Sequence, residues 1–141
     1  YSDDHSIYAL SAEGGELRWK SPWRHQSSLL VEDGTLYVSG DGQIFGLEAQ
    51  RGTNLWRFEK AGQFSLSGFP GQIVGGILYI GSMDGHLYAL DSQTGRVRWK
   101  YKTGGAVSAI QVSDSTVFFQ SADGGIYAID AQKAEELFVK P

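Results

Sequence analysis

The residues of this 141-residue chain that could bind a metal or move a proton are three histidines and a set of acidic side chains. His5, His25 and His86 lie far apart in the sequence, and there is no cysteine to join them. His5 follows Asp3 and Asp4, and this group is the best candidate metal site because imidazole and carboxylate are common ligands. It falls in an expected hairpin turn, where solvated polar residues are usual. We therefore assign no metal ligand.

Acidic residues recur at the ends of strand-like segments. Asp91 and Asp130 hold equivalent places, and Glu48 and Ser11 take the same place in two other copies. A side chain at this place accepts hydrogen bonds from the amides of the following turn. Acid–base catalysis needs carboxylates that converge, and residues spread over separate repeats do not. No nucleophile elbow, Ser-His-Asp spacing or phosphate loop is present. We assign no catalytic and no cofactor-binding residue.

These residues belong to copies of one unit, which is clearest from Gly81 to Tyr101. The unit contains a hairpin turn, a strand, a second turn and another strand, at Asp84-Gly85, His86 to Asp91, Thr94-Gly95 and Val97 to Tyr101. An aromatic residue recurs at intervals of 37, 43 and 39 residues, as Tyr8, Phe45, Tyr88 and Tyr127. Seven residues later stand Gly15, Gly52, Gly95 and Ala134, and eleven residues later stand Trp19, Trp56, Trp99 and Phe138. A period near 40 residues with four short strands per copy is typical of a propeller blade.

The repeats divide the whole chain, residues 1–141, into blades. Residues 1–20 supply two strands, a half blade, and residues of about 25–60, 62–103 and 106–141 supply four strands each. Strands are expected at Tyr1–Leu10, Glu16–Lys20, Ser27–Glu32, Thr35–Gly40, Gln43–Glu48, Asn54–Glu59, Phe64–Val74, Ile77–Gly81, His86–Asp91, Val97–Tyr101, Ala106–Val112, Thr116–Gln120, Gly125–Asp130 and Glu135–Val139. Pro22 and Trp23 are expected in a loop. Ala131–Leu137 has the composition of a helix, but its place in the repeat predicts a turn and an outer strand.

Two sets of repeated side chains have alternative roles. The tryptophan of each copy is expected to lie between neighbouring blades, stacked over a glycine that has no Cβ; a row of rings for a sugar or a quinone is the alternative. In the strand that ends the clearest unit, Arg96, Arg98, Lys100 and Lys102 alternate with Val97, Trp99 and Tyr101. On an outer strand this basic stripe indicates a solvated edge that resists aggregation, and a partner-binding surface is the alternative.

Composition excludes several classes of protein. The net charge is −4, which argues against a surface for nucleic acid or anionic membranes. No apolar run approaches the ~20 residues that span a bilayer. The absence of cysteine excludes disulfides and thiolate metal sites. The first residue is not methionine, so a processed or truncated start is expected.

The segment from Ala89 to Trp99, ALDSQTGRVRW, resembles the tryptophan-docking motif of the quinoprotein (PQQ-like) β-propeller repeats. The resemblance covers the chain in four copies: Ala9 to Trp19 has Ser11 in place of the aspartate, Gly46 to Trp56 has Glu48, and Ala128 to Phe138 lacks both glycine and tryptophan. The family implies an all-β fold, here about three and a half four-stranded antiparallel blades in an incomplete ring. It does not by itself fix the function.

The resemblance implies two branches of function. One is the quinone-dependent dehydrogenases, whose calcium-assisted quinone sits in a funnel beside a vicinal cysteine pair; this chain has no cysteine and no match to their carboxylates. The other is non-enzymatic and includes periplasmic scaffolds of outer-membrane assembly and sensor domains attached to bacterial kinases. We expect a non-catalytic binding or scaffold module of a larger bacterial protein, without a cofactor and extracytoplasmic by resemblance. A dehydrogenase fragment is the alternative.

The open ends of such an incomplete ring predict a further contact. End blades with apolar faces need a cover, because repeat arrays do not tolerate uncapped ends. Either the rest of the same propeller supplies it or a second copy does, and two copies would hold the strands of seven four-stranded blades. A short repeat chain that closes its ring by homodimerisation is therefore a third hypothesis. A separate protein partner bound by the module is also expected.

Overall fold

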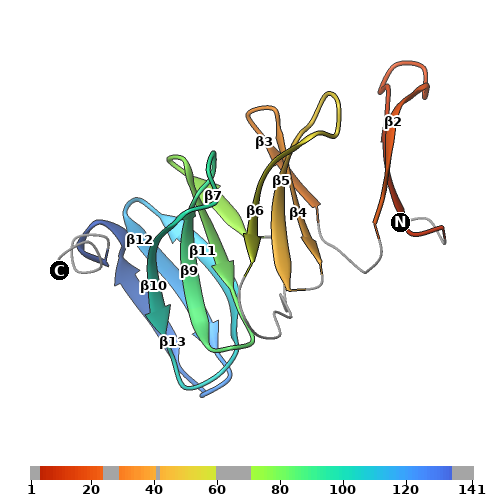
Figure 1. Cartoon of the computed structure of the whole chain (residues 1–141). Coiled ribbons are helices and arrows are strands. Elements are labelled where there is room, and N and C mark those ends of the chain that lie inside the picture. The colour runs from red at the N-terminus through yellow and green to blue at the C-terminus, as the bar shows by residue number, and fades with distance from the viewer. Residues whose placement is uncertain (1–3, 24–28, 41, 60–70, 135–141) are drawn as a thin grey trace.

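The computed structural model describes residues 4–23, 29–40, 42–59 and 71–134. Antiparallel sheets stand side by side in a row, with the N-terminal hairpin at one end and the C-terminal sheet at the other (Figure 1). The ring is open, and the architecture is the all-β propeller segment that the repeats predict. One helical turn, residues 131–134, follows the last described strand.

Each sheet is a meander in which strands follow one another in chain order. The first sheet pairs β1 (Ser6–Leu10) with β2 (Leu17–Pro22). The second contains β3 (Leu29–Glu32), β4 (Thr35–Gly40), β5 (Gln43–Glu48) and β6 (Asn54–Glu59). The third contains β7 (Gln72–Val74), β8 (Ile77–Gly81), β9 (His86–Asp91) and β10 (Val97–Lys102). The fourth contains β11 (Val107–Ser113), β12 (Thr116–Ser121) and β13 (Ile126–Asp130).

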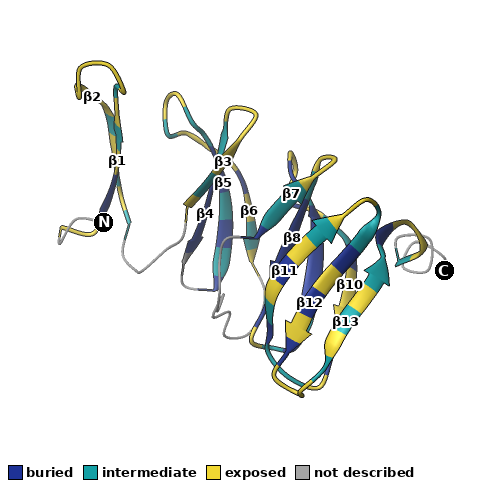
Figure 2. Ribbon diagram, turned by 180° about the vertical axis from the view of Figure 1, so that it is seen from behind, coloured by how far each residue is buried: buried dark blue, intermediate teal, exposed yellow. Residues whose placement is uncertain are grey.

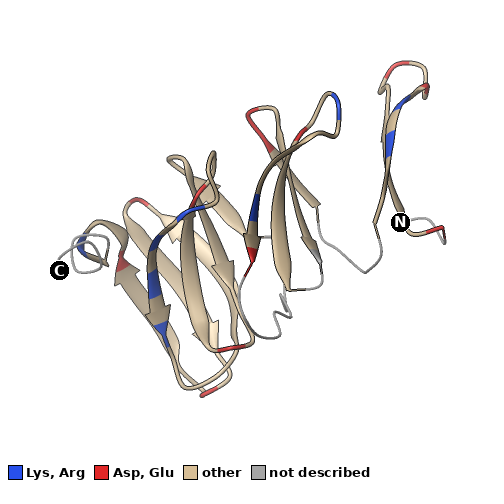
Figure 3. Cartoon of the chain, in the orientation of Figure 1, with Lys and Arg blue, Asp and Glu red and all other residues tan. Residues whose placement is uncertain are grey.

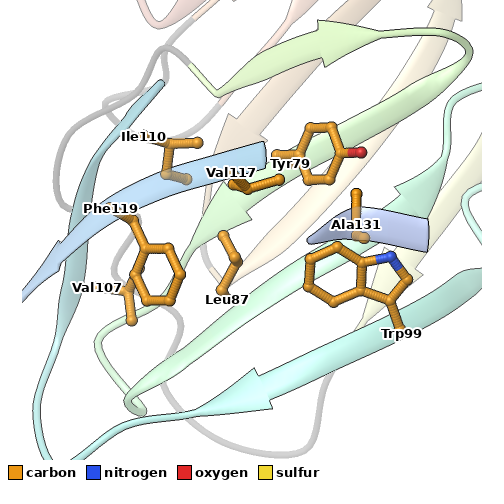
Figure 4. Packing of buried hydrophobic residues seen from close by; sticks show 9 residues of the cluster. Tyr79, Leu87, Trp99, Val107, Ile110, Val117, Phe119 and Ala131 are labelled. Carbon is orange, nitrogen blue, oxygen red and sulfur yellow. The ribbon is translucent and has the colours of Figure 1, made fainter. Parts of the chain in front are cut away.

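The hydrophobic core lies between neighbouring sheets. Leu87 and Trp99 of the third sheet pack with Val107, Val117 and Phe119 of the fourth (Figure 4). Two similar clusters fill the spaces between the first and second sheets and between the second and third. Because alternate strand residues point to opposite faces, an interior sheet sends one set of side chains to each neighbour. Figure 2 shows the result: buried residues run through the interior sheets, and the outward face of the fourth sheet is exposed.

A β-bulge directly precedes the tryptophan of each outer strand. The register shifts between Val97 and Trp99 in β10, and corresponding shifts occur where β2 pairs with β1 and β6 with β5. The extra residue of a bulge changes the side to which the chain points. Val97 therefore packs with Leu90 toward the second sheet, while Trp99 packs with Leu87 toward the fourth. The expected strict alternation, with Val97 and Trp99 on one face, is wrong at this position.

Pro22 also departs from expectation. It is the last residue of β2, opposite Ser6, instead of part of a loop. The strand tolerates it because β2 has one described neighbour and its other edge needs no amide donor. Trp23 lies just outside the strand and donates its backbone amide to the carbonyl of His5. Its ring packs edge-on against the ring of Phe45, with 4.8 Å between the two ring centroids.

Residues 131–134 form a helical turn, where the repeat predicts a non-helical turn before an outer strand. Asp130 caps it by accepting the amides of Gln132 and Lys133 at 3.0 and 3.1 Å. Asp91 caps the equivalent turn of the preceding copy in the same way. That turn ends at Gly95, which has φ +71°. Ala134 holds the corresponding place, and a residue with a Cβ avoids positive φ, so the last turn stays helical.

Several expectations lie outside the described residues. They are the beginnings of the strands at Ser27–Glu32 and Phe64–Val74, the strand Glu135–Val139, and the contact of Phe138.

Candidate interaction surface

Two of the three histidines, His5 and His86, are described by the structure, and they lie in separate sheets or their turns. Among the described residues, no three His, Asp or Glu side chains gather closely enough to hold an ion. His5 lies in the first turn with φ 54°, and His25 lies outside the described residues. His86 begins β9, where its Nδ1 lies 3.2 Å from Oδ1 of Asp84. The structure thus gathers no metal ligands around any described histidine.

Aspartates in the hairpin turns bind a tyrosine four residues ahead. Tyr88 donates its hydroxyl to Asp84 at 2.8 Å, and Tyr127 donates to Asp123 at 2.7 Å. The Tyr127 hydroxyl and the amides of Gly125 and Gly104 lower the pKa of Asp123 to about 2. A third pair, Asp4 with Tyr8, makes the same contact. The sequence analysis missed this motif, although its signal, an aspartate four residues before the repeated tyrosine, is visible in the sequence.

The strand-end aspartates accept turn amides, as expected. Asp91 Oδ1 accepts the amides of Gln93 and Thr94, both at 3.0 Å. Its other oxygen accepts Arg98 Nη2 at 3.0 Å. The bond from Arg98 is the main cause that lowers the pKa of Asp91, and the turn amides add to it. These carboxylates stabilise the turns that follow their strands.

Trp56 joins the second sheet to the third. Its indole covers Gly46 on its own sheet and Gly95 in the next turn, where an added Cβ would lie 2.4 Å from ring atoms in both cases. Its Nε1 donates to the carbonyl of Ser92 at 3.1 Å. The side chain is buried, as expected. The lack of a Cβ at both glycines is what admits the ring.

Trp19 and Trp99 occupy the equivalent places. Trp19 lies over Gly52 and donates to the carbonyl of Ala49 at 2.9 Å. Trp99 is fully buried, but its Nε1 has no hydrogen-bond partner among the described residues. By the repeat, its acceptor would be the carbonyl of Ala131, which lies in the helical turn that ends at Ala134. The tryptophan that lacks this hydrogen bond is thus the one whose acceptor would lie in the following copy, where Ala134 replaces the glycine.

Basic side chains gather on the outer strands. Figure 3 shows Lys and Arg along β10 and on β2 and β6, with acidic residues mainly at turns and strand ends. On these strands lie Arg18, Lys20, Arg57, Arg98, Lys100 and Lys102, and Arg96 directly precedes β10. Some are paired within the chain: Lys20 with Asp4, and Arg57 with Glu59. Four side chains at or beside β10 are exposed: Arg96 directly before the strand, and Lys100, Tyr101 and Lys102 within it.

Comparison with known proteins identifies the family. The family described as outer membrane protein assembly factor BamB matches residues 3–65 and 63–140, nearly the entire chain. The chain belongs to this family. A search of curated protein sequences gave no match.

Solved structures support the family assignment at the level of the fold. BamB from Moraxella catarrhalis superposes with a TM-score of 0.80 and 24% identity, over 94% of this chain and 42% of that one. The computationally designed Ika4 protein gives 0.75 and 19%, over 90% of this chain and 80% of that one. The quinohemoprotein alcohol dehydrogenase ADHIIG from Pseudomonas putida HK5 gives 0.71 and 18%, over 96% and 31%. The chain thus spans less than half the length of the BamB structure it resembles.

Proposed function

We propose that this chain is a non-catalytic β-propeller module that binds a protein partner, as part of a larger bacterial protein with a scaffold or assembly role. One observation carries the proposal. Asp84, Asp91, Asp123 and Asp130 are engaged in turn hydrogen bonds, whereas basic side chains lie exposed on outer strands. Polar groups that shape turns and an exposed charged rim suit recognition of another macromolecule.

We further propose that each sheet is one blade, with a half blade at residues 1–20 and blades at about 25–60, 62–103 and 106–141. The tryptophans would act as docking contacts that fix each blade to the next. The placement of Trp19 over Gly52 and Trp56 over Gly95 supports this division, because each contact crosses from one sheet to the following turn. Such contacts would hold the outer strands at fixed positions for a partner.

A second candidate function is a fragment of a quinone-dependent dehydrogenase. The superposition on a quinohemoprotein alcohol dehydrogenase favours it at the level of the fold. The absence of cysteine and the lack of any gathered set of carboxylates among the described residues weigh against it.

The two functions separate in one assay of purified protein. With added calcium and pyrroloquinoline quinone, we expect no stoichiometric quinone binding and no dye-linked oxidation of alcohols or sugars. Quinone binding with turnover would replace the binding-module proposal with the dehydrogenase. In parallel, a photo-crosslinking amino acid placed at Arg57 or Lys100 should capture one defined protein in cells. The same group at Ser113, the last residue of β11, should not. Equal capture at all three positions would contradict a specific partner surface.

A further inference from the structure

Among the described strands, β10 has a neighbour along only one of its two backbone edges. The third sheet has the order β10-β9-β8-β7, so β9 covers one side of β10 and no described strand covers the other. An edge of this kind presents free amide and carbonyl groups that can pair with an added strand. Lys100, Tyr101 and Lys102 are all exposed along it. The edge is therefore accessible to an extended segment from another protein.

The two faces of β10 differ sharply beyond its bulge. Lys100 and Lys102 stand opposite Tyr88 and His86 of β9 and share one face. Tyr101 points to the other face, where its ring lies 6.2 Å from Phe119 and 6.0 Å from Tyr127. Tyr101 remains 40% exposed, so part of this aromatic group is open to contact. One face thus offers positive charge and the other an aromatic surface.

The positive charge of β10 is only partly neutralised within the chain. Arg98 pairs with Asp91, and Lys102 donates to the backbone carbonyl of Asp84, a contact that leaves its charge in place. Neither Arg96 nor Lys100 forms an ion pair with a described carboxylate. A chain with a net charge of −4 thus places a local excess of positive charge on one strand.

We propose that β10 binds an extended protein segment in which acidic and apolar side chains alternate. A strand paired with β10 sends alternate side chains to the same two faces. Its carboxylates would meet Lys100 and Lys102, and its apolar side chains would meet Tyr101. The same lysines repel the basic edge of another copy, so one set of charges rejects self-pairing and selects an acidic partner. This inference rests on the proposed function and names the chemistry of its partner.

A fluorescence titration tests this recognition with the full chain and a labelled eight-residue peptide of alternating Glu and Val. We expect saturable one-to-one binding that weakens when salt rises from 50 to 300 mM, because exposed charges are screened. A peptide with Lys in place of Glu should not bind. An acidic peptide whose alternate amides are N-methylated should bind at least tenfold more weakly, because it cannot complete the ladder.

Matched variants locate the site. Lys100→Glu should weaken peptide binding at least tenfold and Lys100→Gln about threefold, whereas Lys133→Glu, the same charge change on the exposed helical turn, should change it less than twofold. Equal losses in Lys100→Glu and Lys133→Glu would overturn the proposal, as would no effect of N-methylation. It also fails if single-stranded DNA or anionic lipid vesicles bind with the same dependence on Lys100, since charge alone would then explain binding. Those failures leave the proposed function standing, because only quinone turnover or unspecific crosslinking refutes that.

Discussion

Substituting Gly95 with alanine tests whether the tryptophan contacts, and not the turns alone, hold neighbouring sheets together. Gly95 has φ +71°, and a Cβ added there would lie 2.4 Å from Cε3 of Trp56. Gly15 is the matched control, because it has φ +70° with nothing within 4 Å of an added Cβ. Both substitutions force alanine into the left-handed region, at a cost of about 1–2 kcal/mol each. Only Gly95→Ala must also displace Trp56.

The displacement should cost a further 1–3 kcal/mol or so, the usual range for overpacking a close-packed site. Urea unfolding of both variants, followed by tryptophan fluorescence and far-UV circular dichroism, measures the difference. Removing the ring with Trp56→Ala should make Gly95→Ala no more costly than Gly15→Ala, since the clash partner is gone. Equal destabilisation by Gly95→Ala and Gly15→Ala in the presence of Trp56 would refute the contact as a structural link.

Four other predictions follow from individual side chains. Trp99→Ala should lower the free energy of unfolding by about 3–5 kcal/mol, because Trp99 is fully buried; a loss below 1 kcal/mol in urea unfolding would contradict its packing role. Ala134→Gly should end the last turn as Gly95 ends the preceding one, and so give Trp99 Nε1 a hydrogen-bond acceptor. The free energy of unfolding should rise by about 0.5–1.5 kcal/mol, and the indole N–H resonance of Trp99 should shift. An unchanged resonance would contradict this. The hydrogen bonds in the folded chain lower the pKa of Asp123 from 3.8 to about 2, so the carboxylate stabilises the fold fully above pH 5 and loses this effect as the pH falls toward 2. The difference in unfolding free energy between the unsubstituted chain and Asp123→Asn should therefore shrink on acid titration over that range. A difference that stays constant with pH would exclude the Asp123 carboxylate as its source. Ile126 is 79% exposed, so light scattering of the isolated 15.4 kDa chain should show self-association that Ile126→Lys reduces; a monomer in both cases would show that this face tolerates water.

The repeat made most of the fold predictable from sequence. A glycine and a tryptophan at constant offsets fix where turns and outer strands fall, because each copy must present the same contacts to its neighbours. The buried Trp56 and the amide-accepting Asp91 were both found in this way. The turn at 131–134 shows the limit of the approach. There Ala134 replaces the glycine, and local helix geometry prevails over the register of the repeat.

The candidate surface was less predictable. The sequence showed a basic stripe but placed Val97 with Trp99, because a bulge cannot be recognised from alternation alone. It also did not reveal that Lys100 and Lys102 share a face while Tyr101 joins an aromatic group on the other. The turn aspartates and their tyrosines lie four residues apart, and only the folded hairpins explain why that spacing recurs.

Hydrogen–deuterium exchange of the full chain, with and without the alternating Glu–Val peptide, tests most directly whether β10 is a partner-binding edge. The account predicts slower exchange for backbone amides within residues 97–102 on the side away from β9, and unchanged exchange along β6, the outer strand of the second sheet. Peptide binding that leaves the amides of β10 unprotected, or that protects β6 equally, would contradict it.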